Sequence, residues 1–149
     1  MQDLTLPPIQ AKFKKEDDKT FIFDILRKKY IFLTPEEWVR QHLIHLLIDK
    51  YDYPKALISC EKGLSYNKRT KRTDIVTYSQ EGNPFLLIEC KAPKIKLSKN
   101  TLHQASTYNS QLKAPFLCIS NGINTLCFQI NHENGEIKQL SDLPNFLNQ

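Results

Sequence analysis

The sequence lacks several patterns that would assign a chain to a well-marked class of protein. It has no apolar run long enough to span a bilayer and no apolar leader near its start, so we expect a soluble protein without a membrane partner. Its four cysteines include no CxxC pair and its four histidines are spread apart, which argues against a zinc site. Repeats and low-complexity linkers are also missing. The 149 residues are therefore expected to form one globular domain.

The cysteines and the charges indicate a cytoplasmic protein with a polyanionic partner. Cys90, Cys118 and Cys127 fall in strand-like apolar runs, and with Cys60 they are predicted to be free thiols buried in a reducing compartment. Lysine and arginine outnumber aspartate and glutamate by 21 to 16, which gives a net charge of +5. This excess favours a polyanion as partner, although many basic domains are merely soluble.

The order of elements predicts an α/β fold of the restriction-endonuclease-like kind, with a central mixed β-sheet flanked by helices. Residues 1–19 are polar and are expected to form an N-terminal arm or irregular lead-in, ahead of a single domain over 20–149. Helices are predicted from the Thr34-Pro35 start to about residue 49, and over 98–112. Strands are predicted over 21–26, 30–33, 57–61, 74–78, 85–91 and 116–119, followed by a short β tail. The strands at 74–78 and 85–91 are expected to form an antiparallel hairpin.

Two charges stand near the end of one apolar strand, Leu86 to Pro93. Alternation puts Glu89 and Lys91 on one face of this strand and Cys90 on the other. The hairpin return would bring Asp74 beside them. Two carboxylates and the Cys90 backbone carbonyl are hard oxygen ligands suited to Mg²⁺, with Mn²⁺ as a substitute. Lys91 could then orient or deprotonate an attacking water. The alternative is an exposed strand end with an ordinary Glu–Lys pair and Asp74 as a turn residue.

The first predicted helix supplies a further acid. Glu36 lies within about 20° of the centre of the apolar stripe, whereas Glu37 falls toward its edge and Arg40 lies on the inward side. Glu36 is therefore the candidate site acid. The alternative is a first-turn acid that complements the helix dipole, which suits Glu37 better.

Two other groups of polar residues could contact a substrate phosphate. Gln104 and Tyr108 share a face of the second helix, and a solvent-exposed polar face is the alternative for them. A basic loop over 68–72 precedes Asp74 and could neutralise phosphates, although charge runs are often only solvated loops.

These residues resemble known nuclease motifs. Asp74 followed by Glu89-Cys90-Lys91 is similar to the PD-(D/E)xK nuclease motif, with Glu36 as its helix-borne acid. Gln104 to Tyr108 resembles the QxxxY motif of the RecB-like branch. Four segments, taken in order, resemble the N-terminal nuclease domain of type I restriction enzyme R subunits: 34–41, 72–76, 88–93 and 120–122. The resemblance covers about residues 20–130, with Thr73 standing where the motif usually has proline.

The resemblance implies Mg²⁺-dependent hydrolysis of DNA phosphodiester bonds. Asp74 and Glu89 would be metal ligands, Lys91 the catalytic lysine, Glu36 an acid close to the metal, and Gln104 and Tyr108 supporting residues. DNA contacts would come from Lys68, Arg69, Lys71, Arg72 and Arg40. Partners would be DNA and either a second copy or restriction-complex subunits. The helicase motor and helical assembly region of a full R subunit are absent from the sequence, so a DNA-binding or assembly module with little activity alone is the alternative.

Overall fold

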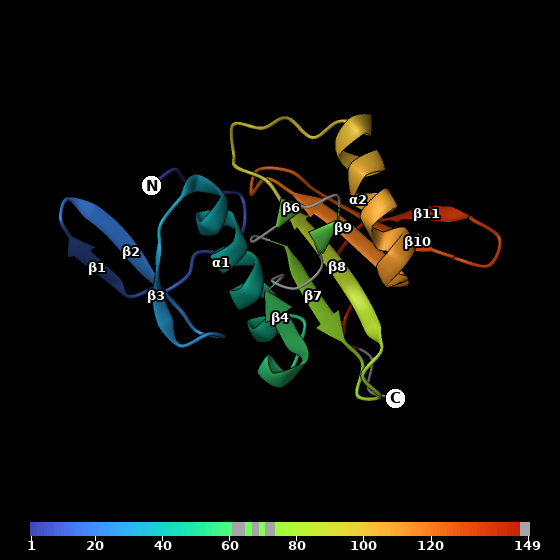
Figure 1. The fold of residues 1–149 in the computed structure, drawn as a ribbon, viewed down its shortest axis with the longest axis horizontal. Helices are drawn as coiled ribbons and strands as arrows, with labels where there is room; N and C mark the ends of the chain where they lie inside the picture. The colour runs from blue at the N-terminus through green and yellow to red at the C-terminus, as the bar shows by residue number, and fades with distance from the viewer. Residues whose placement is uncertain (61–64, 67–68, 71–73, 147–149) are drawn as a thin grey trace.

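A computed structural model describes residues 1–60, 65–66, 69–70 and 74–146, the two short pieces by their backbone only. Its centre is a six-stranded sheet in the order β11-β10-β9-β8-β7-β4, in which β8 and β9 run parallel and the other neighbours antiparallel (Figure 1). The strands are β4 Ile58–Cys60, β7 Ile75–Tyr78, β8 Pro84–Cys90, β9 Phe116–Ser120, β10 Thr125–Ile130 and β11 Ile137–Leu140. A separate pair joins β5 Ser65–Tyr66 to β6 Arg69–Thr70. The predicted mixed sheet and the β7–β8 hairpin are confirmed.

Helices α1 (Pro35–Asp49) and α2 (Lys99–Leu112) cover opposite faces of this sheet. The α1 start is as predicted, because the Thr34 hydroxyl accepts a hydrogen bond from the Glu37 N–H at 3.0 Å and Pro35 opens the helix. Ser98 caps α2 through a reciprocal capping box with Thr101. A single 3-10 turn, Lys55–Leu57, precedes β4. In the described part of the chain, no helix is long and apolar enough to cross a bilayer.

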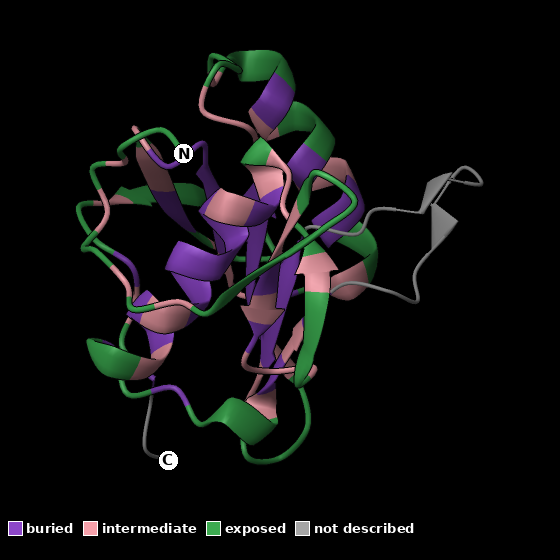
Figure 2. Cartoon of the chain, turned by 90° about the vertical axis from the view of Figure 1, so that its left-hand side faces the viewer, coloured by how far each residue is buried: buried purple, intermediate pink, exposed green. Residues whose placement is uncertain are grey.

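Side chains along β8 alternate between two apolar clusters. Leu86, Ile88 and Cys90 join the cluster on the α1 side, while Leu87 joins the cluster under α2. Buried residues accordingly fill the middle of the molecule and green exposed ones its rim (Figure 2). All four cysteines are free and buried, which confirms the prediction for the thiols. This alternation decides which polar groups at the end of β8 share a face.

A three-stranded antiparallel sheet, β1-β2-β3, precedes α1, with strands Phe13–Glu16, Lys19–Asp24 and Lys29–Phe32. The predicted hairpin is confirmed as β2–β3. The expectation of an irregular lead-in is wrong for β1, which lies within residues 1–19 and pairs with β2. Asp17 and Asp18 both adopt positive φ, 51° and 64°, as in a tight hairpin turn. All four β1 residues are exposed, so β1 lacks the apolar alternation that predicts a strand.

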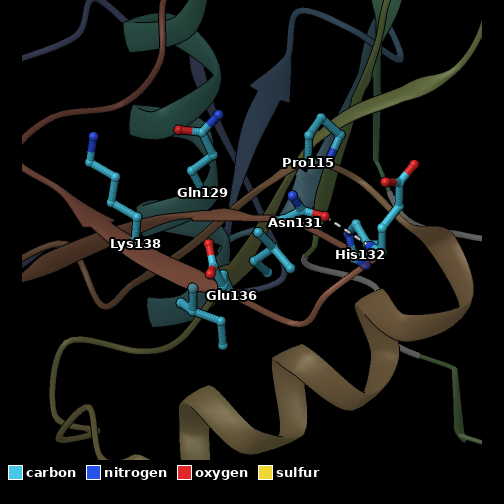
Figure 3. Close-up of a pocket in the computed structure, with 9 residues that line it drawn as sticks. Pro115, Gln129, Asn131, His132, Glu136 and Lys138 are labelled. Carbon is cyan, nitrogen blue, oxygen red and sulfur yellow. Dashed lines mark hydrogen bonds between the residues drawn. The ribbon is translucent and has the colours of Figure 1, made fainter.

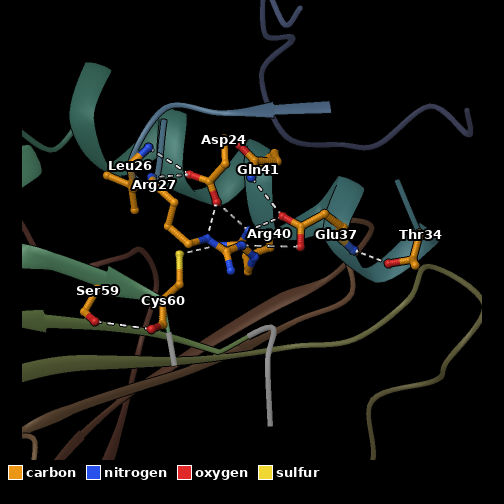
Figure 4. Close-up of polar contacts among 9 residues, drawn as sticks. All are labelled: Asp24, Leu26, Arg27, Thr34, Glu37, Arg40, Gln41, Ser59 and Cys60. Atoms are coloured by element: carbon orange, nitrogen blue, oxygen red, sulfur yellow. Dashed lines mark hydrogen bonds and ion pairs between the residues drawn. The ribbon is translucent and has the colours of Figure 1, made fainter. Parts of the chain in front are cut away.

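A buried ion-pair cluster centred on Arg40 joins this sheet to α1 and β4 (Figure 4). The guanidinium donates to Asp24 of β2 at 2.9 Å, and also to Glu37 one turn earlier and to the Cys60 sulfur. Arg40 and Asp24 are both wholly buried. Asp24 further accepts from the Arg27 side chain at 2.8 Å and from the N–H of Leu26 at 2.8 Å. The cluster therefore ties three elements of the fold at one point.

The charges in the cluster offset the cost of burying them. Burial alone would raise the pKa of Asp24, but the hydrogen bonds and positive charges of Arg40 and Arg27 lower it to about 2. Burial would likewise lower the pKa of Arg40, but Cys60, Glu37 and Asp24 raise it above its ordinary value. Removing one partner of such a pair leaves an uncompensated buried charge, which typically costs about 3–5 kcal/mol.

We expect the free energy of unfolding to fall as the pH is lowered from about 4 toward 2. The folded pKa of Asp24 is about 2 against an ordinary 3.8, so its stabilisation is complete above the unfolded pKa and is lost below it. The loss should be about 2 kcal/mol. Urea denaturation of wild type across this pH range measures it, with exposed Asp142→Asn as the matched control. Asp24→Asn should lose this component of the pH dependence; an unchanged dependence in that variant would contradict the assignment.

Candidate active site

Asp74 and Glu89 meet at the open end of the β7–β8 hairpin. The register pairs Ile75 with Ile88, so Asp74 and Glu89 are the next residues beyond this ladder. Val76 and Leu87 belong to the cluster under α2, and alternation places both carboxylates on that same face. Asp74 is wholly buried and Glu89 is 3% exposed. Cross-strand neighbours of this kind have Cβ atoms about 5 Å apart, so the two carboxylates can act on one ligand.

Lys91 extends this site toward solvent. Its Nζ lies 3.7 Å from Oε2 of Glu89, and its side chain is 25% exposed. Its backbone N–H donates to the Ser120 carbonyl at 2.8 Å, which continues the parallel pairing of β8 with β9 past the end of β8. The ammonium is thereby held beside a buried carboxylate, at the edge where a solvent-borne substrate could reach it.

Cys90 lies between Glu89 and Lys91 and points to the opposite, α1 side of the sheet. Burial raises the pKa of its thiol well above the ordinary value, and the charges of Asp74, Glu89 and Glu36 raise it further, whereas Arg40 lowers it. The thiol itself, wholly buried and kept protonated, is a core side chain.

The acid that enters the core from α1 is Glu37, contrary to the prediction. Glu37 is 5% exposed and its Oε2 accepts from Arg40 and, at 2.8 Å, from Gln41. Glu36 is half-buried, and its charge acts on Cys90. The apolar stripe predicted the wrong burial for Glu36 and Glu37, because α1 packs against the N-terminal sheet on one side and the central sheet on the other. Its buried residues consequently surround most of the helix, including Arg40, Gln41 and His42.

Of the two polar residues singled out on α2, Tyr108 is 3% exposed and belongs to the cluster that includes Val76 and Leu87. It lies on the sheet face that also carries Asp74 and Glu89. Gln104, one turn earlier, is exposed. The two residues thus share a helix but differ in environment, and their supporting role stays a prediction.

The predicted DNA contacts divide into two groups. Lys68, Lys71 and Arg72 lie outside the described residues, and Arg69 is described only as a backbone position of β6. Arg40 is wholly buried and held by Asp24, Glu37 and Cys60, so its guanidinium serves the core and does not reach a ligand on the surface. The expectation of a DNA contact at Arg40 is corrected accordingly.

Asn121, which the sequence did not single out as a site residue, fastens the segment that follows Lys91. This buried asparagine donates from Nδ2 to the Ile95 carbonyl at 2.7 Å. Its Oδ1 accepts from the N–H groups of Ile123 at 2.9 Å and Asn124 at 2.8 Å. The side chain therefore ties the segment after β8 to the turn after β9. The only sequence signal is its place in the Ser120-Asn121-Gly122 segment already noted for its resemblance.

Gly122, next in the same turn, brings the start of the chain against the site region. It has φ +83°, and a Cβ there would meet Leu4 Cδ2 at 2.8 Å and Val39 Cγ2 at 3.0 Å. The Thr5 N–H donates to the Gly122 carbonyl at 2.9 Å. Glycine is needed here both for its backbone conformation and for this close approach.

The donors present fit a small divalent cation that keeps several waters. Among the described residues, no three His, Cys, Asp or Glu side chains are grouped to hold a metal. The predicted set is of another kind, namely two adjacent buried carboxylates and a strand carbonyl. Oxygen donors of this number and hardness are what Mg²⁺ takes from a protein when it retains water ligands.

A surface hollow lies elsewhere, beside the β10–β11 hairpin (Figure 3). Its lining residues include Pro115, His132 and Lys138, and the His132 Nε2 is 2.8 Å from the Ala114 carbonyl. Pro115 precedes the start of β9, whereas Lys91 binds at its other end, at Ser120. None of the predicted site residues lines this hollow in the described part of the chain, so it is separate from the carboxylates.

The mixed sheet, its flanking helices and the carboxylate–lysine set at one strand end define a protein with an α/β nuclease-like fold. The family model for the type I restriction enzyme R protein N terminus matches residues 35–144. The chain belongs to this family. The match begins at the first residue of α1 and includes Asp74, Glu89, Lys91 and Asn121. No curated protein matches the chain.

We expect Asn121→Ala to lower the free energy of unfolding by about 1–3 kcal/mol, because the Ile95 carbonyl and two N–H groups lose a buried partner. Urea denaturation measures the loss, and amide exchange at Ile123 and Asn124 should accelerate. Asn134→Ala is the matched control, since exposed Asn134 also accepts a turn hydrogen bond, from Glu136 at 2.9 Å. Equal losses in both variants would contradict a special role for Asn121.

Proposed function

We propose that this chain is a metal-dependent nuclease that hydrolyses DNA phosphodiester bonds. The observation that carries the proposal is the buried pair Asp74 and Glu89 at one strand end, with the Lys91 ammonium 3.7 Å from Glu89 at the solvent edge. Two carboxylates on one sheet face offer hard oxygen ligands to a divalent cation, and a lysine at the solvent edge can meet an anionic substrate. Membership of the restriction enzyme R family supports the same activity.

Asp74, Glu89 and the Cys90 carbonyl would hold Mg²⁺, with Mn²⁺ as a substitute. A divalent ion bound there lowers the pKa of a water ligand and offsets negative charge on a phosphate. Asp74, Glu89 and Lys91 contribute by holding their polar atoms in fixed positions. The burial of Asp74 and Glu89 fixes their oxygens, and the backbone bond from Lys91 to Ser120 fixes the start of the lysine side chain.

Lys91 is the proposed catalytic lysine. Its ammonium can donate a hydrogen bond to an attacking water or to a phosphate oxygen, which stabilises charge that develops as the bond to phosphorus forms. Glu36, half-buried in the first turn of α1, is the proposed acid near the metal. Tyr108 and Gln104 are proposed to support this set from α2, Tyr108 from the interior and Gln104 from the surface.

The proposed partners are DNA and the other subunits of a restriction complex, in keeping with the family, or a second copy of the chain. The segment that precedes Asp74 carries Lys68, Arg69, Lys71 and Arg72, which are proposed to bind phosphates. Positive charges this close to Asp74 in the sequence would favour binding of the DNA backbone.

Purified wild type should nick supercoiled plasmid in the presence of Mg²⁺ or Mn²⁺. Lys91→Ala should slow nicking by about 100-fold or more, because a positioned proton donor contributes at least that much to the rate. Gel quantification of nicked plasmid over time measures the rate. Lys138→Ala, which removes an exposed lysine of β11, should cleave like wild type.

Absence of cleavage by wild type with both metals, or equal rates for Lys91→Ala and wild type, would exclude the proposed activity. Salt-dependent DNA binding that survives Asp74→Asn, in a chain that never cleaves, would instead establish the alternative of a DNA-binding or assembly module.

Metal binding has a test that does not depend on cleavage. Mn²⁺ should raise the melting temperature of wild type, since a ligand at 100 times its Kd stabilises the folded state by about 3 kcal/mol. Asp74→Asn and Glu89→Gln should each lose most of this shift, because each removes a charged ligand. Glu133→Gln, an exposed acid in the turn after β10, should retain it. An undiminished shift in both site variants would place the metal elsewhere.

A further inference from the structure

The outer face of the β1-β2-β3 sheet carries four aromatic rings in two cross-strand pairs. Ile22 and Asp24 of β2 are wholly buried, so the alternate residues Phe21 and Phe23 face away from α1. The register pairs Phe21 with Phe32 and Phe23 with Tyr30, and paired residues share a face. The ring centroids lie 5.9 Å apart in the first pair and 5.3 Å in the second. The rings therefore form one continuous aromatic surface across β2 and β3.

Lysines border the same surface. Lys14 pairs with Phe21, and its Nζ lies 5.4 Å from the Tyr30 ring centroid. Lys12 lies beside Phe23, whose N–H donates to the Lys12 carbonyl at 2.9 Å, and its Nζ is 5.9 Å from the Phe23 ring centroid. Lys19, at the start of β2, is exposed on this face as well. The acid on this face of β1 is Glu16, which lies 3.2 Å from Lys14.

The surface is not needed for the core. Neither buried cluster includes these four rings among its members or among the hydrophobic residues packed against it, as far as the chain is described. Tyr30 is 39% exposed and Phe32 is 49% exposed. Exposing such rings is unfavourable for a surface that has no ligand. The sheet also precedes residues 35–144, which match the family model.

The chemistry of this surface selects among possible occupants. Lysines are depleted at the centre of protein–protein interfaces, whereas here they lie over the rings themselves. Duplex DNA offers its bases only by their edges. A single strand exposes the faces of its bases, which stack on aromatic rings, and its phosphates are neutralised by neighbouring lysines.

We infer that the outer face of the β1-β2-β3 sheet binds single-stranded nucleic acid, with bases stacked on Tyr30, Phe32 and their partners Phe23 and Phe21, and with phosphates bound by Lys12, Lys14 and Lys19. This binding does not require hydrolysis at the carboxylate site. It would give the chain a contact for an unpaired strand at a distance from Asp74, on an element held to α1 by the Arg40 cluster.

Fluorescence anisotropy with a labelled oligothymidylate in EDTA tests this inference, because EDTA removes the divalent ions that hydrolysis would need. Tyr30→Ala with Phe32→Ala should weaken binding by about 25-fold or more, since each lost stacking contact typically costs at least fivefold. Tyr30→Phe with Phe32→Tyr should bind like wild type, because every base can stack on either ring. Lys14→Ala should reduce the slope of log K against log salt by about 0.7.

The sheet supplies its own matched controls. Phe13 is 49% exposed, like Phe32, but it pairs with Ile22 on the opposite face, and its ring centroid lies 6.1 Å from that of Trp38. Phe13→Ala should therefore leave binding unchanged. Lys15 is the neighbour of Lys14 but also lies on that opposite face, paired with Thr20. Lys15→Ala is therefore the control for the change in salt slope expected of Lys14→Ala. Circular dichroism verifies that each variant is folded.

Wild-type affinity in the folded Tyr30→Ala/Phe32→Ala variant would overturn the inference. So would equal losses in the Phe13→Ala control, or a wild type that sediments as a dimer and becomes a monomer only in the double variant, which would make the surface a contact between copies. Plasmid nicking by Phe32→Ala is a separate readout, so failure of this inference and failure of the nuclease proposal can be told apart.

Discussion

The buried ion pair of Arg40 with Asp24 and Glu37 is the constraint on which the arrangement of the fold depends. Arg40 is wholly buried in α1, Asp24 ends β2, and the Cys60 sulfur brings β4 into the same cluster. The Arg40 charge is buried away from water, so separating α1 from β2 and β4 would leave it without compensating partners. Glu37 is the immediate neighbour of Glu36, and the bond from Arg40 therefore fixes the helical turn that carries Glu36.

The central sheet separates two environments. On its α1 side, the Cys90 thiol at the end of β8 belongs to the larger apolar cluster, whereas its α2 side carries Asp74, Glu89 and Lys91 in the same region. Burial keeps the thiol protonated and therefore unreactive. On the other face, Glu89 lies in β8 and Asp74 directly precedes β7, and placement on or beside strands gives the precision that catalytic or ligand groups require.

Short-range sequence patterns predicted the positions of helices and strands better than they predicted which face of α1 is buried. Thr34-Pro35 predicted the start of α1, and the turn over 80–84 predicted the β7–β8 hairpin that brings Asp74 beside the end of β8, because both features depend on residues close in sequence. The assignment of Glu36 as the inward acid was wrong, since a helix covered on two sides buries polar residues as well as apolar ones. Strand β1 was missed because all its residues are exposed, and the role of Asn121 depends on Ile95, which is distant in sequence.

The parallel pairing of β8 with β9 has a consequence for how the site assembles. Asp74 and Glu89 lie at the two ends of a short hairpin, so bringing them to one end of the sheet closes a small loop and costs little chain entropy. The apolar cluster on their face of the sheet is completed only when the chain crosses through α2 and returns as β9. Contacts of this longer range close more slowly. Loss of the packing of α2 and β9, which buries Ala105, Leu117 and Ile119 on this face, would therefore also change the environment of the two carboxylates.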